Sequence, residues 1–242
     1  MGTRGLSGDR CYMLIDDRGR FLSQREHPRM ALISVEETPT VLSIRAAETV
    51  ALELPHQLAE AEETCVSVWN DELDAAVAST EVNHWFSAFL GLSCRLVYMA
   101  ERHHRAVPGG HGRQGDEVSF ADGAPLLLAS TSSLDSLNTR LANPVTMLHF
   151  RPNLVVSGSP PFAEDEWRLI RIGEVELEVS WPCARCVMTT VDPSTGIKAG
   201  DREPLATLGR FRRSPTGALF GQNLIPRKLG LIRVGDAVEI LL

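Results

Sequence analysis

The segment at residues 182–192, with the sequence PCARCVMTTVD, carries the side chains best suited to chemistry. Cys183 and Cys186 stand in a CxxC arrangement, and Arg185 lies between them. A structural zinc ion needs four ligands, usually from two such pairs, and the sequence contains no second pair. A redox dithiol normally starts a helix, whereas residues 187–191 are mostly β-branched and indicate a strand. Both interpretations are therefore disfavoured.

Two interpretations of the cysteine pair remain open. In the first, one cysteine is a functional thiolate, because a neighbouring cation such as Arg185 stabilises a thiolate and a soft transition metal favours this ligand. In the second, the pair consists of two small buried side chains without chemistry, since free cysteine is often buried. The spacing alone does not separate them.

A second candidate is the segment FRPN at residues 150–153, directly ahead of an apolar stretch. Arg151 offers a planar fork suited to phosphate or carboxylate, and Asn153 offers both a donor and an acceptor. Pro152 restricts the backbone between them. From these residues alone, a solvated turn is the simpler explanation.

Several classes of function are disfavoured by composition and by missing motifs. The glycine-rich run at residues 109–112 lacks the following GKS/T of a phosphate-binding loop, and neither GxSxG nor HExxH occurs. The net charge of -7 argues against a nucleic-acid partner. No apolar run approaches the roughly 20 residues that span a bilayer. Five cysteines at irregular spacing, without an apolar signal segment at the N-terminus, are typical of a reducing compartment. We expect a soluble cytoplasmic protein without a membrane partner.

The elements that must position these residues are mostly short strands. In the first 69 residues, strands are expected at residues 11–15, 20–23, 31–35, 40–44 and 65–69. Later strands are expected at residues 126–128, 154–156, 169–172, 175–179, 187–191 and 238–241. Helices are expected at residues 80–90, after Ser132 or Ser133, and at residues 203–213. Because strands outnumber helices and do not alternate with them, we predict a mainly β (α+β) fold with barrel-like sheets.

Several of these segments occur in the same order in one family. They are residues 150–158 (FRPNLVVSG), 163–167 (AEDEW), 172–175 (IGEV), 182–192, 203–208 (EPLATL) and 220–223 (FGQN). The sequence resembles the MOSC-domain family, whose name refers to the C-terminal domain of molybdenum cofactor sulfurase. It is most similar to the branch that contains the mitochondrial amidoxime-reducing component and bacterial reductases of N-hydroxylated compounds.

The resemblance also implies a division into two domains. It is strongest over residues 119–242 and extends more weakly over the β-rich N-terminal part, where Gly8-Asp9-Arg10 and Gln24-Arg25-Glu26 fit. It implies an N-terminal β-rich domain at residues 1–98 and a MOSC β-barrel domain at residues 99–242.

The family binds a molybdenum–pterin cofactor (Mo-molybdopterin), and its functional positions can be carried over residue by residue. The metal-ligating, catalytic cysteine matches Cys186. Arg151 and Asn153 match positions that hold the pterin and its phosphate. Arg10 matches a phosphate-contacting arginine, and Asp122 lies in the segment that lines the cofactor.

The chain departs from the family pattern in three places. Relatives open with a strand whose Lys and Ser bind the cofactor, and this chain begins after that point, so we expect the opening strand to be missing. A serine that some relatives carry is Ala184 here. Certain bacterial relatives carry a C-terminal ferredoxin domain that is absent from this sequence. Pyridoxal phosphate has been linked to larger MOSC fusion proteins, but their aminotransferase-like part is absent as well.

The resemblance implies an enzyme that reduces N-oxygenated small molecules, with molybdenum as the site of electron transfer. Electrons would come from a separate donor protein containing flavin, an iron–sulfur cluster or haem. The alternative is a carrier, in which Cys186 holds sulfur as a persulfide or the protein stores and transfers cofactor without turnover. Molybdenum content and turnover with a reduced artificial donor distinguish these functions.

Overall fold

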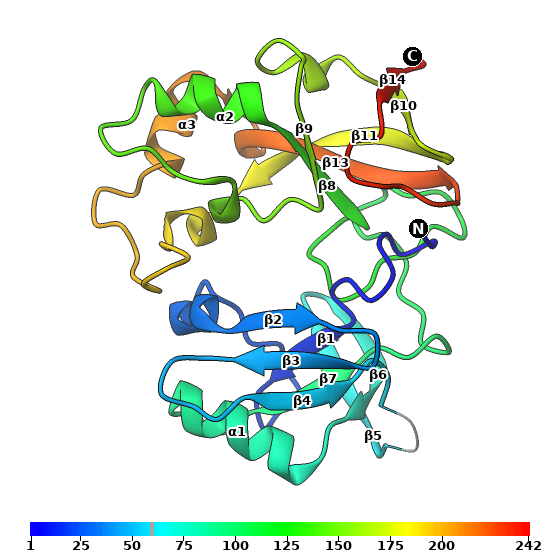
Figure 1. Cartoon of the computed structure of the whole chain (residues 1–242), viewed down its shortest axis with the longest axis vertical. Helices are drawn as coiled ribbons and strands as arrows, with labels where there is room; N and C mark the ends of the chain where they lie inside the picture. The colour runs from blue at the N-terminus through cyan, green and yellow to red at the C-terminus, as the bar shows by residue number, and fades with distance from the viewer. Residues whose placement is uncertain (59–60) are drawn as a thin grey trace. The chain divides into compact units, whose positions relative to one another are not determined.

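A computed structural model describes residues 1–58 and 61–242 (Figure 1). Residues 59–60 fall within the expected N-terminal domain and lie outside the described residues. The described chain forms two compact units. Unit 1 consists of Met1–Ser7, Ala106–Thr190 and Lys198–Leu242, and unit 2 consists of Gly8–Arg105 and Val191–Ile197.

Strands dominate the described part of both units. Unit 2 contains β1 (Tyr12–Ile15), β2 (Ser34–Glu37), β3 (Val41–Arg45), β4 (Leu52–Pro55), β5 (Glu63–Val68), β6 (Asp71–Val77), β7 (Arg95–Tyr98), helix α1 (Thr80–Leu90) and the 3₁₀ helix η1 (Pro28–Leu32). Unit 1 contains β8 (Leu126–Ser130), β9 (Leu154–Val156), β10 (Leu169–Ile172), β11 (Val175–Arg185), β12 (Arg213–Ser214), β13 (Gly217–Lys228), β14 (Val238–Ile240), helices α2 (Thr131–Asn138) and α3 (Leu205–Phe211), and the 3₁₀ helices η2 (Met147–His149), η3 (Ala163–Asp165) and η4 (Val187–Thr190). The sheets form a half-barrel and a nearly closed barrel, so the predicted mainly β fold with barrel domains is confirmed.

Unit 2 packs two antiparallel sheets and α1 around one apolar core. The sheets have the strand orders β1-β7-β6-β5 and β2-β3-β4. Helix α1 has the bounds that the sequence predicts. It begins where the Val82 N–H donates to the Ser79 hydroxyl (3.4 Å) and ends at Gly91, whose φ of 71° suits glycine. Its buried side chains Val82 and Phe86 join a cluster with residues on or next to strands of both sheets, namely Leu14, Ile44, Leu54, Ala78, Cys94 and Leu96.

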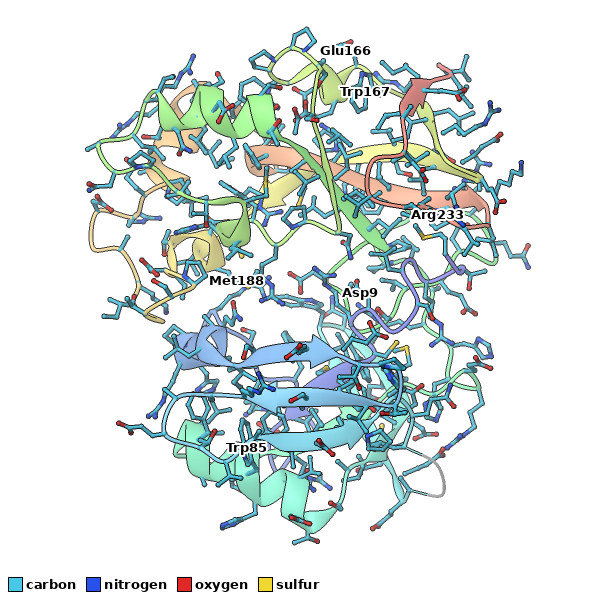
Figure 2. All side chains as sticks on the ribbon, viewed as in Figure 1. Asp9, Trp85, Glu166, Trp167, Met188 and Arg233 are labelled. Atoms are coloured by element: carbon cyan, nitrogen blue, oxygen red, sulfur yellow. The ribbon has the colours of Figure 1, made fainter. Side chains whose placement is uncertain are left out.

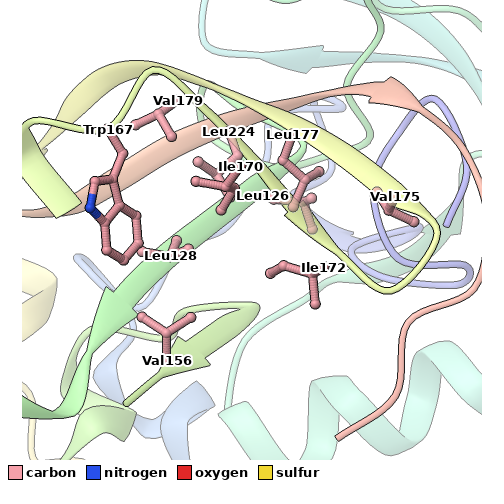
Figure 3. Close-up of a cluster of buried hydrophobic side chains, with 10 residues drawn as sticks. All are labelled: Leu126, Leu128, Val156, Trp167, Ile170, Ile172, Val175, Leu177, Val179 and Leu224. Atoms are coloured by element: carbon pink, nitrogen blue, oxygen red, sulfur yellow. The ribbon is translucent and has the colours of Figure 1, made fainter. Parts of the chain in front are cut away.

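Unit 1 is built on a seven-stranded sheet with the order β14-β10-β11-β13-β8-β9, and β12 pairs with the start of β13. All of its pairs are antiparallel except β8–β9. Strands β11 and β13 run side by side at its centre (Figure 1). Figure 3 shows the apolar cluster that the sheet buries, formed by Leu126, Leu128, Val156, Trp167, Ile170, Ile172, Val175, Leu177, Val179 and Leu224. Alternate residues of β11 supply this cluster, which is the pattern of a strand with one buried face.

The long strand β13 is absent from the sequence-based expectations. Its sequence, GALFGQNLIPRK, contains glycine, asparagine and proline, which are typical of turns rather than strands. Gly221 has a φ of 81°, and a Cβ atom there would lie 2.6 Å from the Leu128 carbonyl oxygen. The glycine therefore permits the close approach of β13 to β8.

Two predicted strands are wrong: residues 20–23 contain only isolated bridges at Arg20 and Phe21, and Val187–Thr190 form the 3₁₀ helix η4. The strand expected at residues 31–35 lies at Ser34–Glu37, after η1. Thr189 and Thr190 are buried, and their hydroxyls donate to the carbonyls of Cys186 (2.9 Å) and Val187 (2.7 Å). These bonds satisfy the buried hydroxyls within one helical turn, which offsets the β propensity of the segment. The strand-based argument against a redox dithiol therefore loses its premise.

Within the described residues, no helix has the length and apolar character needed to cross a membrane.

The core of unit 1 predicts a large difference between two identical substitutions. Val175 on β11 is 0% exposed, whereas Val155 on β9 is 50% exposed. Val175→Ala should lower the free energy of unfolding by about 2 kcal/mol, since it removes buried methyl groups and leaves a cavity. Val155→Ala should lower it by less than about 0.5 kcal/mol. Urea denaturation of both variants checks this, and equal losses would contradict the assigned core.

Candidate functional site

The two cysteines of the CxxC segment lie at the end of β11. Cys183 belongs to the strand, and Cys186 follows it directly, at the start of η4. Met188, labelled in Figure 2, marks this 3₁₀ helix. Both cysteines are half-buried and neither forms a disulfide. The Cys186 carbonyl accepts bonds from the Thr189 N–H (3.1 Å) and hydroxyl (2.9 Å), so the backbone that carries this thiol is well held.

Arg185 connects the end of β11 to the FRPN segment. Its Nη1 donates to the Cys183 sulfur (2.9 Å), and its Nη2 donates to the Phe150 carbonyl oxygen (2.8 Å). The guanidinium carbon lies 5.6 Å from the centroid of the Phe150 ring. A single cation thus bridges the two segments that the sequence singled out.

Arg151 occupies a turn anchored by its predecessor. Phe150 is fully buried and stacks on Phe220 of β13, with the ring centroids 4.0 Å apart. Arg151 itself is exposed and has a φ of 52°, in the left-handed region. Non-glycine residues rarely adopt this conformation, and it occurs mainly where the surrounding structure imposes it, often at functional sites. The turn therefore presents the Arg151 guanidinium at the surface beside a rigid aromatic anchor.

Asn153 makes a structural contact that the sequence did not reveal. Its Oδ1 accepts from the Leu127 N–H (2.9 Å), and its own N–H donates to the Leu127 carbonyl (2.8 Å). This two-bond contact fixes the start of β9 beside β8, the parallel pair of the sheet. Asn153 thus has a role in sheet assembly independent of any ligand.

The segments around Arg151 and Cys186 meet in a second way. Helix η2, which immediately precedes Phe150, packs against η4, which immediately follows Cys186. Unit 1 therefore brings together the FRPN and CxxC segments, which are about thirty residues apart in the sequence.

The two remaining predicted site residues lie in loops. Asp122 is an exposed residue of unit 1 in the loop before β8. Its neighbour Gly123 lies beside Trp181 of β11, because a Cβ atom on Gly123 would be 3.8 Å from the indole. Arg10 belongs to unit 2, has a φ of 50° and pairs with Asp9 (2.5 Å), which is labelled in Figure 2. Both arginines that the family resemblance selects, Arg10 and Arg151, thus have left-handed backbone conformations.

Unit 1 also contains a buried polar network around η3, and the sequence indicated it only through the AEDEW motif. Glu164 is fully buried; its Oε1 accepts from the Ser133 hydroxyl (2.7 Å), and its Oε2 has no hydrogen-bond partner. Asp165 accepts from Gln222 of β13 (2.6 Å) and pairs with Arg212 (2.6 Å) after α3. Burial raises the pKa of the Glu164 carboxyl above its ordinary value. Helix η3 thereby joins α2, β13 and the end of α3.

The chemistry available here centres on one thiol and one surface guanidinium. Among the residues that the structure describes, no three His, Cys, Asp or Glu side chains gather as a metal site. The described residues therefore do not form a zinc site of the four-ligand type. Thiol sulfur, as at Cys186, is a ligand type that suits a soft metal, and an exposed guanidinium, as at Arg151, is a group type that suits a phosphate.

Comparisons with known proteins agree on one family. The pattern of the MOSC domain matches residues 115–239, and that of the MOSC N-terminal beta barrel domain matches residues 1–93. The chain is 36% identical to mitochondrial amidoxime-reducing component 1 of Mus musculus and 34% identical to that of Homo sapiens, in each case over 100% of this chain and 75% of the relative. It is 31% identical to the Xenopus laevis protein of the same name, over 95% of this chain and 71% of the relative.

The raised pKa of Glu164 predicts a pH dependence of stability. The folded protein holds this proton more tightly than the unfolded chain, so the free energy of unfolding falls as the pH rises from the ordinary carboxyl pKa through the raised folded value. Glu164→Gln carries no titrating proton and should remove this fall. Relative to the wild type, the variant should therefore gain stability as the pH rises above the ordinary carboxyl pKa.

Urea denaturation across this pH range checks the prediction. Glu166→Gln is the control, because Glu166 (labelled in Figure 2) is exposed and its replacement should preserve the wild-type pH dependence. A constant stability difference between Glu164→Gln and the wild type at every pH would contradict the prediction.

Proposed function

The chain belongs to the MOSC-domain family, and from that premise we propose that it reduces N-hydroxylated small molecules by means of a molybdenum–pterin cofactor. The observation that carries the proposal is the packing of the Cys186 segment against the Arg151 turn. Relatives named amidoxime-reducing components, 31–36% identical over nearly the whole chain, support the reaction class.

The residues present fit such a cofactor. Cys186 is half-buried and outside any disulfide, so its sulfur can ligate a soft metal. Arg151 is exposed on a rigid turn, and a guanidinium binds phosphate through paired, charge-assisted hydrogen bonds.

We assign the roles as follows. Within unit 1, Cys186 would hold the metal, Arg151 would bind the phosphate, and Asn153 and Asp122 would line the pterin. When bound, the cofactor supplies the two-electron chemistry that cleaves an N–O bond. The protein keeps the Cys186 backbone fixed through the Thr189 bonds and keeps Arg151 oriented through its anchored turn.

The proposal includes a partner and a domain division. Electrons would reach the site from a separate donor protein containing flavin, an iron–sulfur cluster or haem. Residues 1–98 would form the N-terminal β-rich domain, and residues 99–242 would form the MOSC domain that carries Cys186.

The first test separates the two cysteines. Cys186→Ser should abolish turnover of an amidoxime with a reduced artificial donor, because a neutral hydroxyl is a poor replacement for a soft thiolate. Part of the pterin should remain, held by Arg151 and Asn153. Cys183→Ser should retain most of the activity, since its sulfur contacts Arg185 and is not assigned to the metal.

Molybdenum, zinc and turnover are measured on both variants and on the parent. Equal loss in the two variants would support a redox dithiol instead, and zinc in the parent would support a zinc site. A parent protein with persulfide on Cys186 and no molybdenum would support the sulfur carrier. Molybdenum without turnover would support cofactor storage.

The second test uses the left-handed conformation of Arg151. Arg151→Ala should weaken phosphate binding and lose most of the cofactor, since a charge-assisted bond contributes about 1.5–3 kcal/mol. Arg151→Lys should retain an intermediate amount, because it keeps the charge without the planar fork. Arg151→Gly should also lose cofactor, yet it should stabilise the cofactor-free protein by up to about 1 kcal/mol, because glycine adopts a positive φ without strain.

Pterin and molybdenum content, together with urea denaturation of the cofactor-free variants, provide the readouts. Full cofactor retention in Arg151→Ala would make Arg151 an ordinary surface residue. Destabilisation by Arg151→Gly would show that the turn does not strain its backbone.

A further inference from the structure

The contacts of Arg185 join two segments whose relative position matters for the proposed function. We infer that Arg185 is a positioning residue: its guanidinium holds the Arg151 turn against the end of β11 and so sets where the Arg151 side chain stands relative to Cys186. This inference rests on the proposed function and deepens it, since it names what pre-organises the proposed phosphate and metal contacts.

Arg185 contacts the peptide group between Phe150 and Arg151. The carbonyl oxygen of this group accepts from Arg185 Nη2 (2.8 Å), and its N–H donates to the Met147 carbonyl (3.2 Å). Both polar groups of one peptide plane are therefore held. Rotation of this plane is coupled to the φ angle of Arg151, which is 52°. The guanidinium thus helps to maintain the unusual conformation that presents Arg151.

The other terminal nitrogen of the guanidinium contacts the cysteine segment. Nη1 donates to the Cys183 sulfur (2.9 Å), three residues before Cys186 on the same strand end. The fork of Arg185 therefore spans from the β11 end to the FRPN turn. A lysine ammonium is a single point on a flexible stem and does not reproduce this fork.

The position of the Arg185 guanidinium costs folding free energy. Arg185 Nε is buried and has no hydrogen-bond partner in the described structure. A buried donor without a partner costs free energy, and such groups persist where the surroundings impose them. Here the imposing contacts are the Cys183 sulfur, the Phe150 carbonyl and the Phe150 ring, 5.6 Å from the guanidinium carbon.

Unit 1 offers a closely matched control. Arg212 also has a buried Nε without a partner and lies over a phenylalanine, with its guanidinium carbon 4.3 Å from the Phe162 ring centroid. Its ionic partner is Asp165 in the buried polar network around η3. Replacing Arg212 disturbs a similar environment in the same unit without removing the bond to the Phe150 carbonyl.

The experiment compares Arg185→Gln and Arg185→Lys with Arg212→Gln and Arg212→Lys. One readout is amide hydrogen exchange of residues 147–153 in the cofactor-free proteins. The other is the rate at which molybdenum and pterin dissociate from the loaded proteins. Both Arg185 variants should raise both rates by about tenfold or more, as loss of one charge-assisted bond implies. The Arg212 variants should change them by less than about threefold.

Cys183→Ala removes only the sulfur acceptor and serves if the Arg185 variants fold poorly. It should raise exchange of residues 147–153 by a smaller factor, and it should add little to Arg185→Lys, because the two changes break the same bond. Equal effects of the Arg185 and Arg212 substitutions on both readouts would overturn the inference. Faster exchange in the Arg185 variants of a protein that binds no molybdenum would overturn the proposed function and uphold the positioning role.

Discussion

Strands β11 and β13 pair along most of their length, and the candidate site of unit 1 is positioned from this pair. The end of β11 carries Cys183 and Arg185, and Cys186 follows it. On the neighbouring strand, Phe220 supports the Phe150 ring. Gln222, opposite Pro182, donates to Asp165 of the buried network. Because the pairing fixes these side chains relative to one another, a change in register would separate the FRPN turn from the cysteine segment.

The site also concentrates features that cost folding free energy. Arg151 has a positive φ angle, and among the described residues Arg185 Nε lacks a hydrogen-bond partner and Glu164 is buried with one carboxyl oxygen unpaired. Each such feature costs on the order of 1–3 kcal/mol, against a total stability of about 5–15 kcal/mol. Arg151 and Arg185 lie in the two segments that the Arg185 guanidinium joins, which favours a site retained for binding rather than for stability.

Much of the fold and of the candidate site could be predicted from the sequence, and the features that could not be predicted depend on contacts that form only in the folded chain. The bounds of α1 follow from Ser79 and Gly91, whose capping chemistry is local. Strand β13 could not be recognised, because Gly221 serves the approach to Leu128, a contact that only the fold creates. Residues 187–191 favour a strand by propensity, yet buried threonine hydroxyls bond back to the chain and form η4. The motifs singled out the FRPN and CxxC segments, but neither the Asn153–Leu127 contact nor the Arg185 bridge could be predicted from spacing alone.

We propose that Cys186 holds a molybdenum–pterin cofactor whose phosphate lies at Arg151. The most direct measurement is a crystal structure of the cofactor-loaded protein, with anomalous diffraction recorded at the molybdenum edge. We expect a molybdenum peak bonded to the Cys186 sulfur, with the pterin phosphate against the Arg151 guanidinium. A molybdenum peak bonded to Cys183, or one without any protein sulfur ligand, would contradict it.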